Sequence, residues 1–240
     1  MNKDFINYAH RGAPSYCPEN TMLSFYTGVY MGANGIKTDV QVTKDGVLVL
    51  FHDDTLERVT GEKGSVKDYT YLELQKFWVK KDKLKDKIPT LEDFLLHFKD
   101  FNLTFAIELK VGGVEKAVAD MIKKYGIKEK VVVTSFNYDY LKIFKSFAKD
   151  IKLGYLTDKV DNSTIKNLLS DGFYEICPEG RLVNKENVDK WHLLGLNVRA
   201  WGIYNEDIMK AVYNAGVDGM TVNFPDKLAR CILNYYENKF

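Results

Sequence analysis

Two histidines and two acidic residues stand where a protein could transfer protons and bind a metal. Imidazole changes charge near neutral pH, so His10 and His52 together predict general acid–base chemistry. One ring could protonate a leaving alkoxide while the other takes a proton from the attacking group. Asp39 and Glu108 add hard carboxylate oxygens, which are the ligands that Mg²⁺ and Ca²⁺ prefer.

Cationic residues beside these groups predict an anionic substrate. Arg11 directly follows the first histidine, and Lys110 lies two positions after the second acid. Such side chains bind phosphate through charge-assisted hydrogen bonds, so a phosphate ester is the best-matching anion. Lys37 is unusual, because on a strand it points to the same side as Asp39. It therefore places an ammonium group beside a carboxylate suited to a metal.

Each candidate also has an ordinary structural interpretation. Glu108-Leu109-Lys110 could be an ion pair at a strand end, and Trp201 could be a core residue. Glu19-Asn20-Thr21 could cap the following helix. His97 and His192 fall on predicted helices and are interpreted as surface groups. What favours a functional site is that the other candidates gather at the ends of predicted strands.

Short β-branched or aromatic runs alternate with helical patterns along most of the chain. The predicted strands are 5–9, 35–42, 47–52, 103–109, 130–136, 151–156, 173–177, 196–202 and 217–222. The predicted helices are 19–31, 90–99, 114–124, 138–149, 163–170, 185–194, 205–214 and 226–237. Thr90 and Asn205 are start signals, and Gly216 falls where a helix C-cap belongs.

This alternation predicts an α/β protein with parallel strands and right-handed crossovers. The strands at 35–42 and 47–52 count as one barrel element plus a return strand, which leaves eight parallel strands. In 240 residues this predicts one domain spanning 1–240, built as a (β/α)₈ TIM barrel. A doubly wound open sheet is the alternative, and the lack of a glycine-rich loop after the first strand disfavours it. In a barrel the strand ends meet at one rim.

The return strand carries a finer prediction. Asp45-Gly46 is typical of a two-residue hairpin turn. In that register Asp39 lies opposite His52, and directly opposed residues share a face of the sheet. The two side chains are therefore expected to stand together.

Residues 53–88 interrupt the strand–helix alternation. The segment is polar and rich in turns, and it predicts a small inserted subdomain on the rim after the second barrel strand. Two interpretations of its aromatic residues stay open: they select the substrate's alcohol group, or they form a small core. These residues are Tyr69, Tyr71, Phe77 and Trp78.

Composition excludes several classes of function. The formal net charge is +1, which gives no overall field to attract nucleic acid or an anionic membrane. No leader peptide is expected, and no apolar run reaches the roughly 18 residues of a membrane anchor. Three cysteines without regular spacing predict neither disulfides nor a zinc site, so a cytoplasmic protein is expected. The oligomeric state is left open.

An ordered set of motifs resembles the glycerophosphodiester phosphodiesterase family over nearly the whole chain. The motifs are His10-Arg11-Gly12, Pro18-Glu19-Asn20-Thr21, the stretch 32–40, Thr43-Lys44-Asp45-Gly46, His52-Asp53, Glu108-Leu109-Lys110, Ser135-Phe136, Trp201 and Gly216-Val217-Asp218-Gly219. The resemblance implies a TIM barrel with a small insertion after His52. It also implies hydrolysis of glycerophosphodiesters to glycerol 3-phosphate and an alcohol such as choline or ethanolamine. The order of the motifs disfavours an unrelated sugar-phosphate enzyme.

The resemblance further implies four kinds of role: proton transfer, binding of Mg²⁺ or Ca²⁺, substrate binding and support. Proton transfer falls to His10 and His52, and metal binding to Asp39 and Glu108. Arg11 and Lys110 would bind the phosphate, and Trp201 would lie beside the glycerol. Glu19 would support these residues.

Lys37 departs from this family pattern, which has a glutamate there as a third metal ligand. An ammonium group repels a cation, and one unit-charge contact at about 4 Å is worth about 4 kcal/mol at an effective dielectric near 20. Three interpretations remain: a metal site left weakened or empty with impaired catalysis, a metal-independent enzyme, or a non-catalytic phosphodiester-binding protein. The first is favoured. Gly202 and Asn223 also depart from the usual threonine and aspartate.

Overall fold

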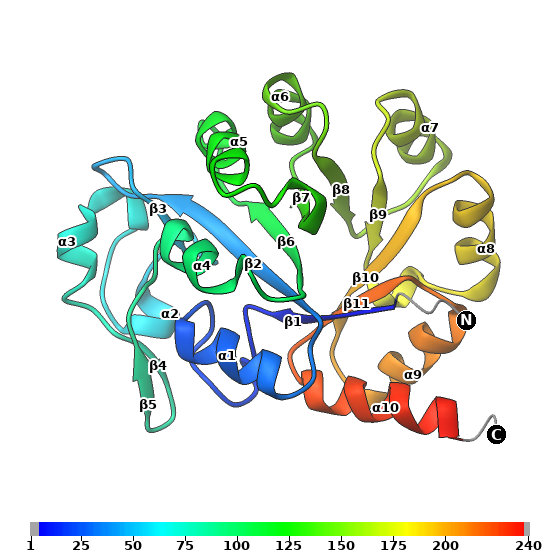
Figure 1. Cartoon of the computed structure of the whole chain (residues 1–240), viewed down its shortest axis with the longest axis horizontal. Coiled ribbons are helices and arrows are strands. Elements are labelled where there is room, and N and C mark those ends of the chain that lie inside the picture. The colour runs from blue at the N-terminus through cyan, green and yellow to red at the C-terminus, as the bar shows by residue number, and fades with distance from the viewer. Residues whose placement is uncertain (1–4, 238–240) are drawn as a thin grey trace.

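Eight parallel strands form a closed barrel in the computed structural model, which describes residues 5–237 (Figure 1). In sheet order they are β1 (Ile6–His10), β11 (Gly219–Val222), β10 (Asn197–Ile203), β9 (Glu175–Pro178), β8 (Lys152–Thr157), β7 (Val131–Ser135), β6 (Thr104–Leu109) and β2 (Gly35–Val42). Pairing of β1 with β2 closes the sheet. The predicted (β/α)₈ barrel is confirmed, and an open doubly wound sheet is excluded.

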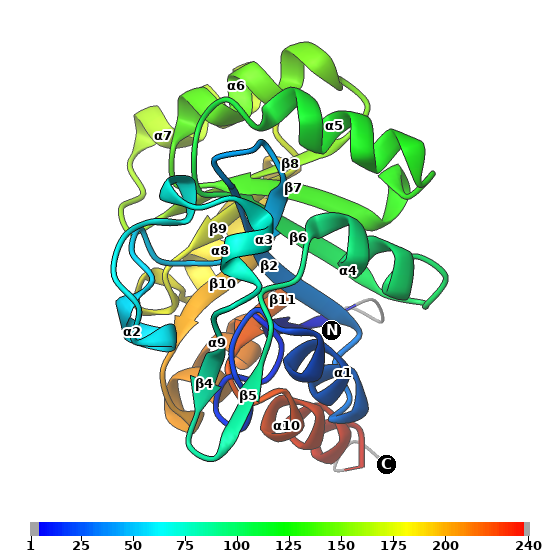
Figure 2. The same cartoon turned by 90° about the vertical axis from the view of Figure 1, so that its left-hand side faces the viewer.

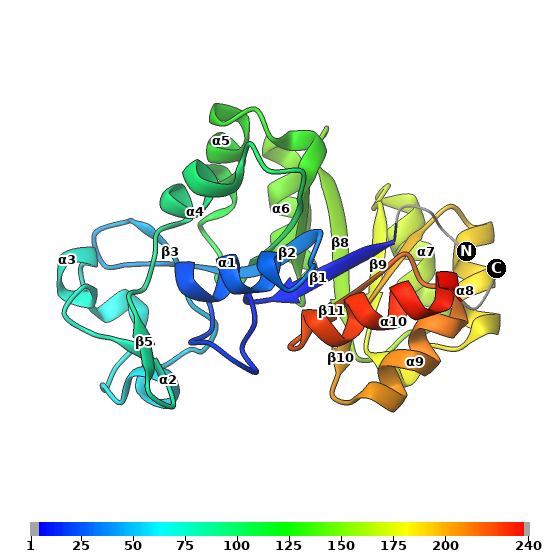
Figure 3. The same ribbon diagram turned by 60° about the horizontal axis from the view of Figure 1, so that its bottom comes forward.

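Helices surround the barrel, and each predicted helix is present with small displacements at its ends (Figure 3). They are α1 (Met22–Tyr30), α4 (Leu91–Phe98), α5 (Glu115–Lys124), α6 (Tyr138–Phe147), α7 (Asn162–Ser170), α8 (Lys185–Leu193), α9 (Glu206–Ala215) and α10 (Pro225–Glu237). Thr90 caps α4, since its side chain accepts from the backbone N–H of Asp93. Asn205 caps α9 in the same way. Among residues 5–237, no helix has the length and apolar character needed to span a bilayer.

Alternation along the strands separates an apolar outer face from a polar inner one. On β6, Phe105, Ile107 and Leu109 belong to the main hydrophobic core between strands and helices. Glu108, between two of them, points inward and lines a cavity. The same pattern holds on β2, where Ile36 belongs to the core. The barrel interior is therefore free to hold charged groups near the strand ends.

Substitution of Phe94 tests the packing of this core. It is fully buried, and its ring centroid lies 4.8 Å from that of Phe25 and 5.5 Å from that of Phe105. Phe94→Ala is expected to lower the free energy of unfolding by about 3–5 kcal/mol, because the removed ring leaves a cavity. Tyr30→Ala, at a 92% exposed position, is the control and should change it by less than about 0.5 kcal/mol. Urea denaturation measures both; a loss below about 1 kcal/mol for Phe94→Ala would contradict the packing described.

The hairpin register predicted from the sequence is wrong by one residue. The return strand is β3 (Leu48–Leu50), and Val40 lies opposite Leu50, where a two-residue turn would have placed Gln41. The connection is a three-residue loop that ends on Gly46 at a φ of 85°. This is the common hairpin form in which a type I turn is followed by a left-handed residue.

The slip changes which side chains share a face. Asp39 lies beside Phe51 instead of His52, and the Phe51 N–H donates to the Asp39 carbonyl at 3.0 Å. Leu50 joins the main core, whereas Val49 packs into a second core under the insertion. The site below shows that His52 nevertheless reaches the barrel mouth, from the loop after β3 rather than from the strand.

The segment after β3 builds a small unit, whose ribbon is seen in Figure 2. This unit has its own hydrophobic core. Its elements are α2 (Glu57–Thr60), a 3₁₀ turn at Val66–Asp68, α3 (Tyr71–Leu74), and a hairpin of β4 (Val79–Lys81) and β5 (Leu84–Asp86). Figure 1 shows these elements together at the end of the molecule away from α7 and α8. We propose that 53–88 is one inserted unit of a single domain spanning 1–240.

Three of the four aromatic residues of this unit pack against its core, and the fourth, Trp78, packs against lysines of the unit. Tyr69, Tyr71 and Phe77 contact the second core, and the Tyr69 and Phe77 ring centroids lie 5.2 Å apart. Lys87 Nζ lies 3.5 Å from the ring centre of Trp78. None of the four lines the barrel cavity, which favours the small-core interpretation over a role in substrate selection.

Candidate active site

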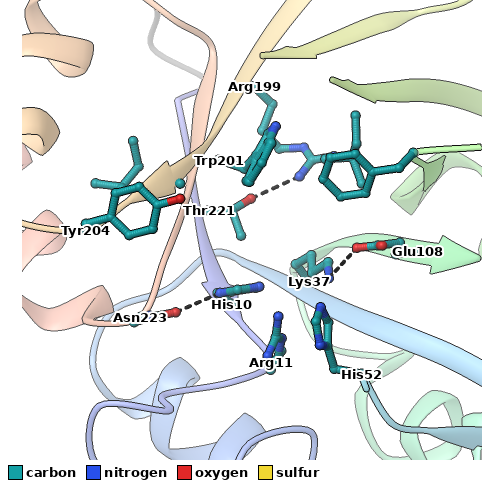
Figure 4. A pocket seen from close by; sticks show the side chains of 14 residues that line it. His10, Arg11, Lys37, His52, Glu108, Arg199, Trp201, Tyr204, Thr221 and Asn223 are labelled. Atoms are coloured by element: carbon teal, nitrogen blue, oxygen red, sulfur yellow. Dashed lines mark hydrogen bonds and ion pairs between the residues drawn. The ribbon is translucent and has the colours of Figure 1, made fainter. Parts of the chain in front are cut away.

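A cavity of about 340 Å³ lies at the carboxyl ends of the barrel strands (Figure 4). Figure 4 shows His10, Arg11, Lys37 and His52 pointing toward one space from β1, β2 and the loops that follow β1 and β3. The lining residues are His10, Arg11, Lys37, His52, Glu108, Phe136, Leu156, Arg199, Trp201, Gly202, Ile203, Tyr204, Thr221 and Asn223.

Strand register explains how these groups meet. His10 pairs with Lys37 across β1 and β2, and Asp39 pairs with Glu108 across β2 and β6. Paired residues on neighbouring strands point to the same face. Since Lys37 and Asp39 are two apart on one strand, all four side chains face the barrel interior.

Lys37 bridges the two carboxylates. Its ammonium group pairs closely with Oδ1 of Asp39 and lies 2.6 Å from Oε2 of Glu108. The three side chains are at most 4% exposed, so water screens these charges little. The lysine nitrogen thus occupies the space between the two acids.

The remaining oxygens of both carboxylates also have partners. Asp39 Oδ2 accepts from Asn20 Nδ2 at 2.9 Å and lies 3.2 Å from Arg11 Nε. Glu108 Oε1 accepts from Lys110 Nζ at 3.1 Å. All four carboxylate oxygens are therefore engaged by nitrogen atoms of the protein.

These cations also fix the charge of Asp39. Burial alone would raise the pKa of this carboxyl, but Lys37 and Arg11 outweigh burial and hold the pKa well below its usual range. Asp39 is therefore ionised at neutral pH and forms part of a charge-balanced cluster.

His10 presents a neutral ring to the cavity. Its Nδ1 lies 2.7 Å from Oδ1 of Asn223, an acceptor, so Nδ1 carries the proton and Nε2 has the free lone pair. Burial lowers the pKa of His10 well below its usual value, and the charges of Arg11 and Lys37 lower it further. The ring is thus prepared to accept a proton.

His52 stands across the cavity mouth in the loop after β3. Gln41 holds that loop, because its Nε2 donates to the carbonyls of Phe51 and Asp53 at 3.2 and 2.7 Å. His52 Nδ1 lies 2.7 Å from Oδ1 of Asp53, so a carboxylate orients the ring. Burial lowers the pKa of His52, although the charge of Asp39 opposes that shift.

The predicted support residue Glu19 lies behind Arg11. Its Oε1 accepts from Arg11 Nη1 at 2.8 Å, and Arg11 itself adopts a left-handed backbone at a φ of 55°. The Arg11 N–H donates to the Lys37 carbonyl at 2.7 Å, which fixes that conformation. Glu19, Asp39 and Lys110 do not line the cavity but contact residues that do.

Apolar side chains form the other wall. Trp201 and Phe136 meet edge to face with ring centroids 5.0 Å apart, beside Leu156. The indole N–H of Trp201 donates to the Cys177 carbonyl at 3.0 Å, which fixes the ring. The cavity is therefore polar on the β1–β2 side, while Phe136, Leu156 and Trp201 form an apolar surface on the β7–β10 side, where Arg199 and Tyr204 also line it.

Sequence reasoning did not assign a site role to several lining residues. Arg199 is 1% exposed; its Nε donates to Glu175 Oε2 at 3.0 Å and its Nη1 donates to Thr221 Oγ1 at 2.9 Å. Tyr204 comes from the loop after β10 and Asn223 from the loop after β11. An arginine in the middle of an apolar strand pattern was one available signal, and the departure of Asn223 from the family pattern was another.

The family model described as glycerophosphoryl diester phosphodiesterase matches residues 10–227. The chain belongs to this family. A glycerophosphodiester phosphodiesterase of Bacillus altitudinis is 34% identical over 93% of this chain and 96% of its own length. These proteins are phosphodiesterases by name, so the chain belongs to a family of enzymes.

Solved structures of the family share the barrel. A putative glycerophosphodiester phosphodiesterase of Galdieria sulphuraria superposes with a TM-score of 0.87 at 26% identity, covering 97% of this chain and 100% of that one. A phosphodiesterase of Oleispira antarctica, solved with its product sn-glycerol-3-phosphate, gives 0.85 at 24% identity, covering 94% and 95%. At that identity the second likeness concerns the fold alone.

A divalent metal at Asp39 and Glu108, which the family resemblance implies, does not fit these residues. The ammonium of Lys37 stands between the acids, and a metal there would lie against a positive charge. Among the described residues, Glu19, His52 and Asp53 form the group whose ligand atoms lie within 4.8 Å of one another. Glu19 and Asp53 in that group already bind the guanidinium of Arg58.

Proposed function

We propose that the cavity binds glycerophosphodiesters and hydrolyses them to glycerol 3-phosphate and an alcohol. The main support is that His10 and His52 face one cavity. In each ring Nδ1 lies beside a hydrogen-bond acceptor, which leaves Nε2 for proton transfer. Arg11 and Lys37 supply positive charge in the same space. This combination suits an anionic ester that must gain and lose protons.

We place the phosphate against Arg11 and Lys37, and the glycerol against Trp201. The guanidinium and the ammonium line the same cavity as the two histidines, and the indole offers a flat apolar surface. Lys110 contributes charge through Glu108. The Oleispira relative was solved with glycerol 3-phosphate, which agrees with this class of product.

We assign the two histidines different tasks. Burial and two neighbouring cations keep His10 neutral, which suits a general base that takes a proton from the attacking group. Burial lowers the pKa of His52 too, but the charge of Asp39 and the hydrogen bond to Asp53 oppose that shift, so the pKa falls less than that of His10. A bound phosphate anion opposes the shift further, so His52 is the general acid that protonates the leaving alkoxide.

Lys37 takes the place of the expected metal in this proposal. Its ammonium carries one positive charge where Mg²⁺ or Ca²⁺ would carry two, so it stabilises developing negative charge on phosphate less strongly. Catalysis is therefore metal-independent and slower than in a family member with a bound metal. Of the interpretations left open by the sequence, the proposal adopts the metal-independent enzyme and keeps the reduced rate that the favoured one implied.

The test is product release from glycerophosphocholine by the unmodified protein in EDTA, with glycerol 3-phosphate measured enzymatically. Slow but saturable release is expected. Calorimetry with the same ester separates the alternative: binding without any product favours a non-catalytic phosphodiester-binding protein. If the protein neither binds the ester nor releases product, the proposal is contradicted.

A further inference from the structure

Arg58 connects the insertion, through two carboxylates, with the cavity residues His52 and Arg11. It lies on α2, which Leu56 and Val59 anchor in the core of the inserted unit. Its guanidinium binds two carboxylates at once. Nη1 and Nη2 donate to Glu19 at 2.9 and 2.6 Å, and Nη2 also donates to Asp53 at 2.9 Å. Arg58 itself does not line the cavity.

One branch of this contact leads to His52. Asp53 Oδ1 accepts both from Arg58 and from His52 Nδ1, the latter at 2.7 Å. Hydrogen bonds from Arg58 and His52 outweigh burial and lower the pKa of Asp53 to about 2. Asp53 is therefore ionised at neutral pH, and Arg58 limits the directions in which it can accept from the imidazole.

The other branch leads to Arg11. Glu19 Oε1 accepts from Arg58 Nη2 at 2.6 Å and from Arg11 Nη1 at 2.8 Å. Burial would raise the pKa of Glu19, but hydrogen bonding from Arg58 outweighs it and keeps the group ionised. The Glu19 side chain is 13% exposed and that of Arg58 is 50% exposed, so the carboxylate end of this contact is largely shielded from water while the arginine end is half open to it.

We propose that Arg58 is a positioning residue that fixes His52 and Arg11 relative to each other, and so makes the insertion part of the active site. The inference rests on the proposed function, because it assigns proton transfer to His52 and phosphate binding to Arg11. A planar guanidinium reaches both carboxylates in fixed directions, which a lysine ammonium cannot do. The inserted unit thereby helps to orient two side chains of the active site.

The two branches predict separable kinetic effects. Arg58→Ala is expected to lower kcat/KM about 100-fold, since a displacement of about 1 Å in a reacting group can cost that much. Asp53→Asn should lower mainly kcat, because it disturbs His52, and Glu19→Gln should raise mainly KM, because it frees Arg11. Arg58→Lys should fall between Arg58→Ala and the unmodified protein.

Chemical rescue distinguishes positioning from mere stabilisation. Guanidinium ion added at millimolar concentration should restore part of the kcat of Arg58→Ala, because it can occupy the space between Glu19 and Asp53. The matched control is Arg230→Ala, which removes an exposed arginine paired with Asp226 at 2.9 Å on α10. It should leave kcat and KM unchanged and show no rescue. Thermal unfolding of each variant confirms that it is folded.

Three outcomes decide the inference. Rescue of Arg58→Ala together with the kcat and KM split supports it. Unchanged kcat and KM in a folded Arg58→Ala would overturn it. The inference would also be overturned if Asp53→Asn and Glu19→Gln changed kcat and KM alike and guanidinium did not rescue Arg58→Ala, because that result indicates a structural role. Absence of turnover in the unmodified protein would instead contradict the proposed function.

Discussion

Lys37→Glu is expected to make hydrolysis of glycerophosphocholine depend on Mg²⁺ or Ca²⁺, whereas the protein with Lys37 turns over in EDTA. The substitution removes the ammonium between Asp39 and Glu108 and places a third carboxylate there. Local charge changes by two units, and each unit-charge contact at about 4 Å is worth about 4 kcal/mol at an effective dielectric near 20. The cluster in Lys37→Glu therefore attracts Mg²⁺ or Ca²⁺, which the cluster with Lys37 repels.

The size of the effect follows from the role of the cation. Without metal, Lys37→Glu should lose about 10²–10³ in kcat, as when one electrostatic contact to a developing anion is removed. With metal it should exceed the rate of the lysine form. Lys37→Met is the control: it is neutral and of similar length, so it should be slow with or without metal. Glycerol 3-phosphate release measures all three proteins.

Thermal unfolding gives a second readout that does not depend on activity. Three ionised acids in one buried pocket repel each other, so Lys37→Glu should unfold at a lower temperature in EDTA than the lysine form. A metal that binds only the folded state restores about 2.7 kcal/mol at 100 times its Kd. The lysine form should not respond to metal at all. Metal-dependent turnover by the lysine form would contradict the whole assignment.

Most of the site could be predicted because of how parallel strands are arranged. His10 and Glu108 lie near the carboxyl ends of strands that alternate with helices, and those ends meet at one rim; Lys37 pairs with His10 from the neighbouring strand β2. Spacing along a strand placed Lys37 beside Asp39, which the structure shows as a direct ion pair. Such inferences need only the period of the strand and the direction of pairing.

The hairpin register could not be predicted because distant contacts decide it. The Lys44 N–H donates to the Tyr69 carbonyl at 2.9 Å, and the Tyr71 N–H donates to Oδ1 of Asp45 at 2.9 Å. The insertion therefore holds the turn from outside. The local Asp-Gly signal identifies a turn, but it does not specify whether the loop has two residues or three.

The role of Arg58 and the contact of Asn223 with His10 escaped prediction for a related reason. Arg58 lies in a polar segment where an arginine resembles any other surface residue. Its role becomes visible only in the folded protein, where it contacts both Glu19 and Asp53. Asn223 follows the last strand, and its contact with His10 joins residues 213 apart in the chain. Contacts of this range come from closure of the barrel, which no local pattern records.

His52→Gln and His10→Gln are expected to differ in their response to the leaving group. Glycerophosphocholine releases an alkoxide that must be protonated, so loss of the general acid should lower its turnover about 10²–10⁴-fold. The p-nitrophenyl ester of glycerol 3-phosphate releases a stable phenolate that needs no proton. His52→Gln should therefore retain most activity on that ester, whereas His10→Gln should lose activity on both substrates.

The comparison rests on the different surroundings of the two rings. His10 is partly buried beside Arg11 and Lys37, whose charges favour a neutral base, while His52 is 30% exposed and bonded to an ionised aspartate. His97→Gln is the matched control, because His97 lies on the outer helix α4 with its Nδ1 2.9 Å from the Asp93 carbonyl. It should leave both reactions unchanged. If His10→Gln alone retained activity on the activated ester, the acid and base roles would be exchanged; equal losses in both variants on both esters would refute the division of tasks.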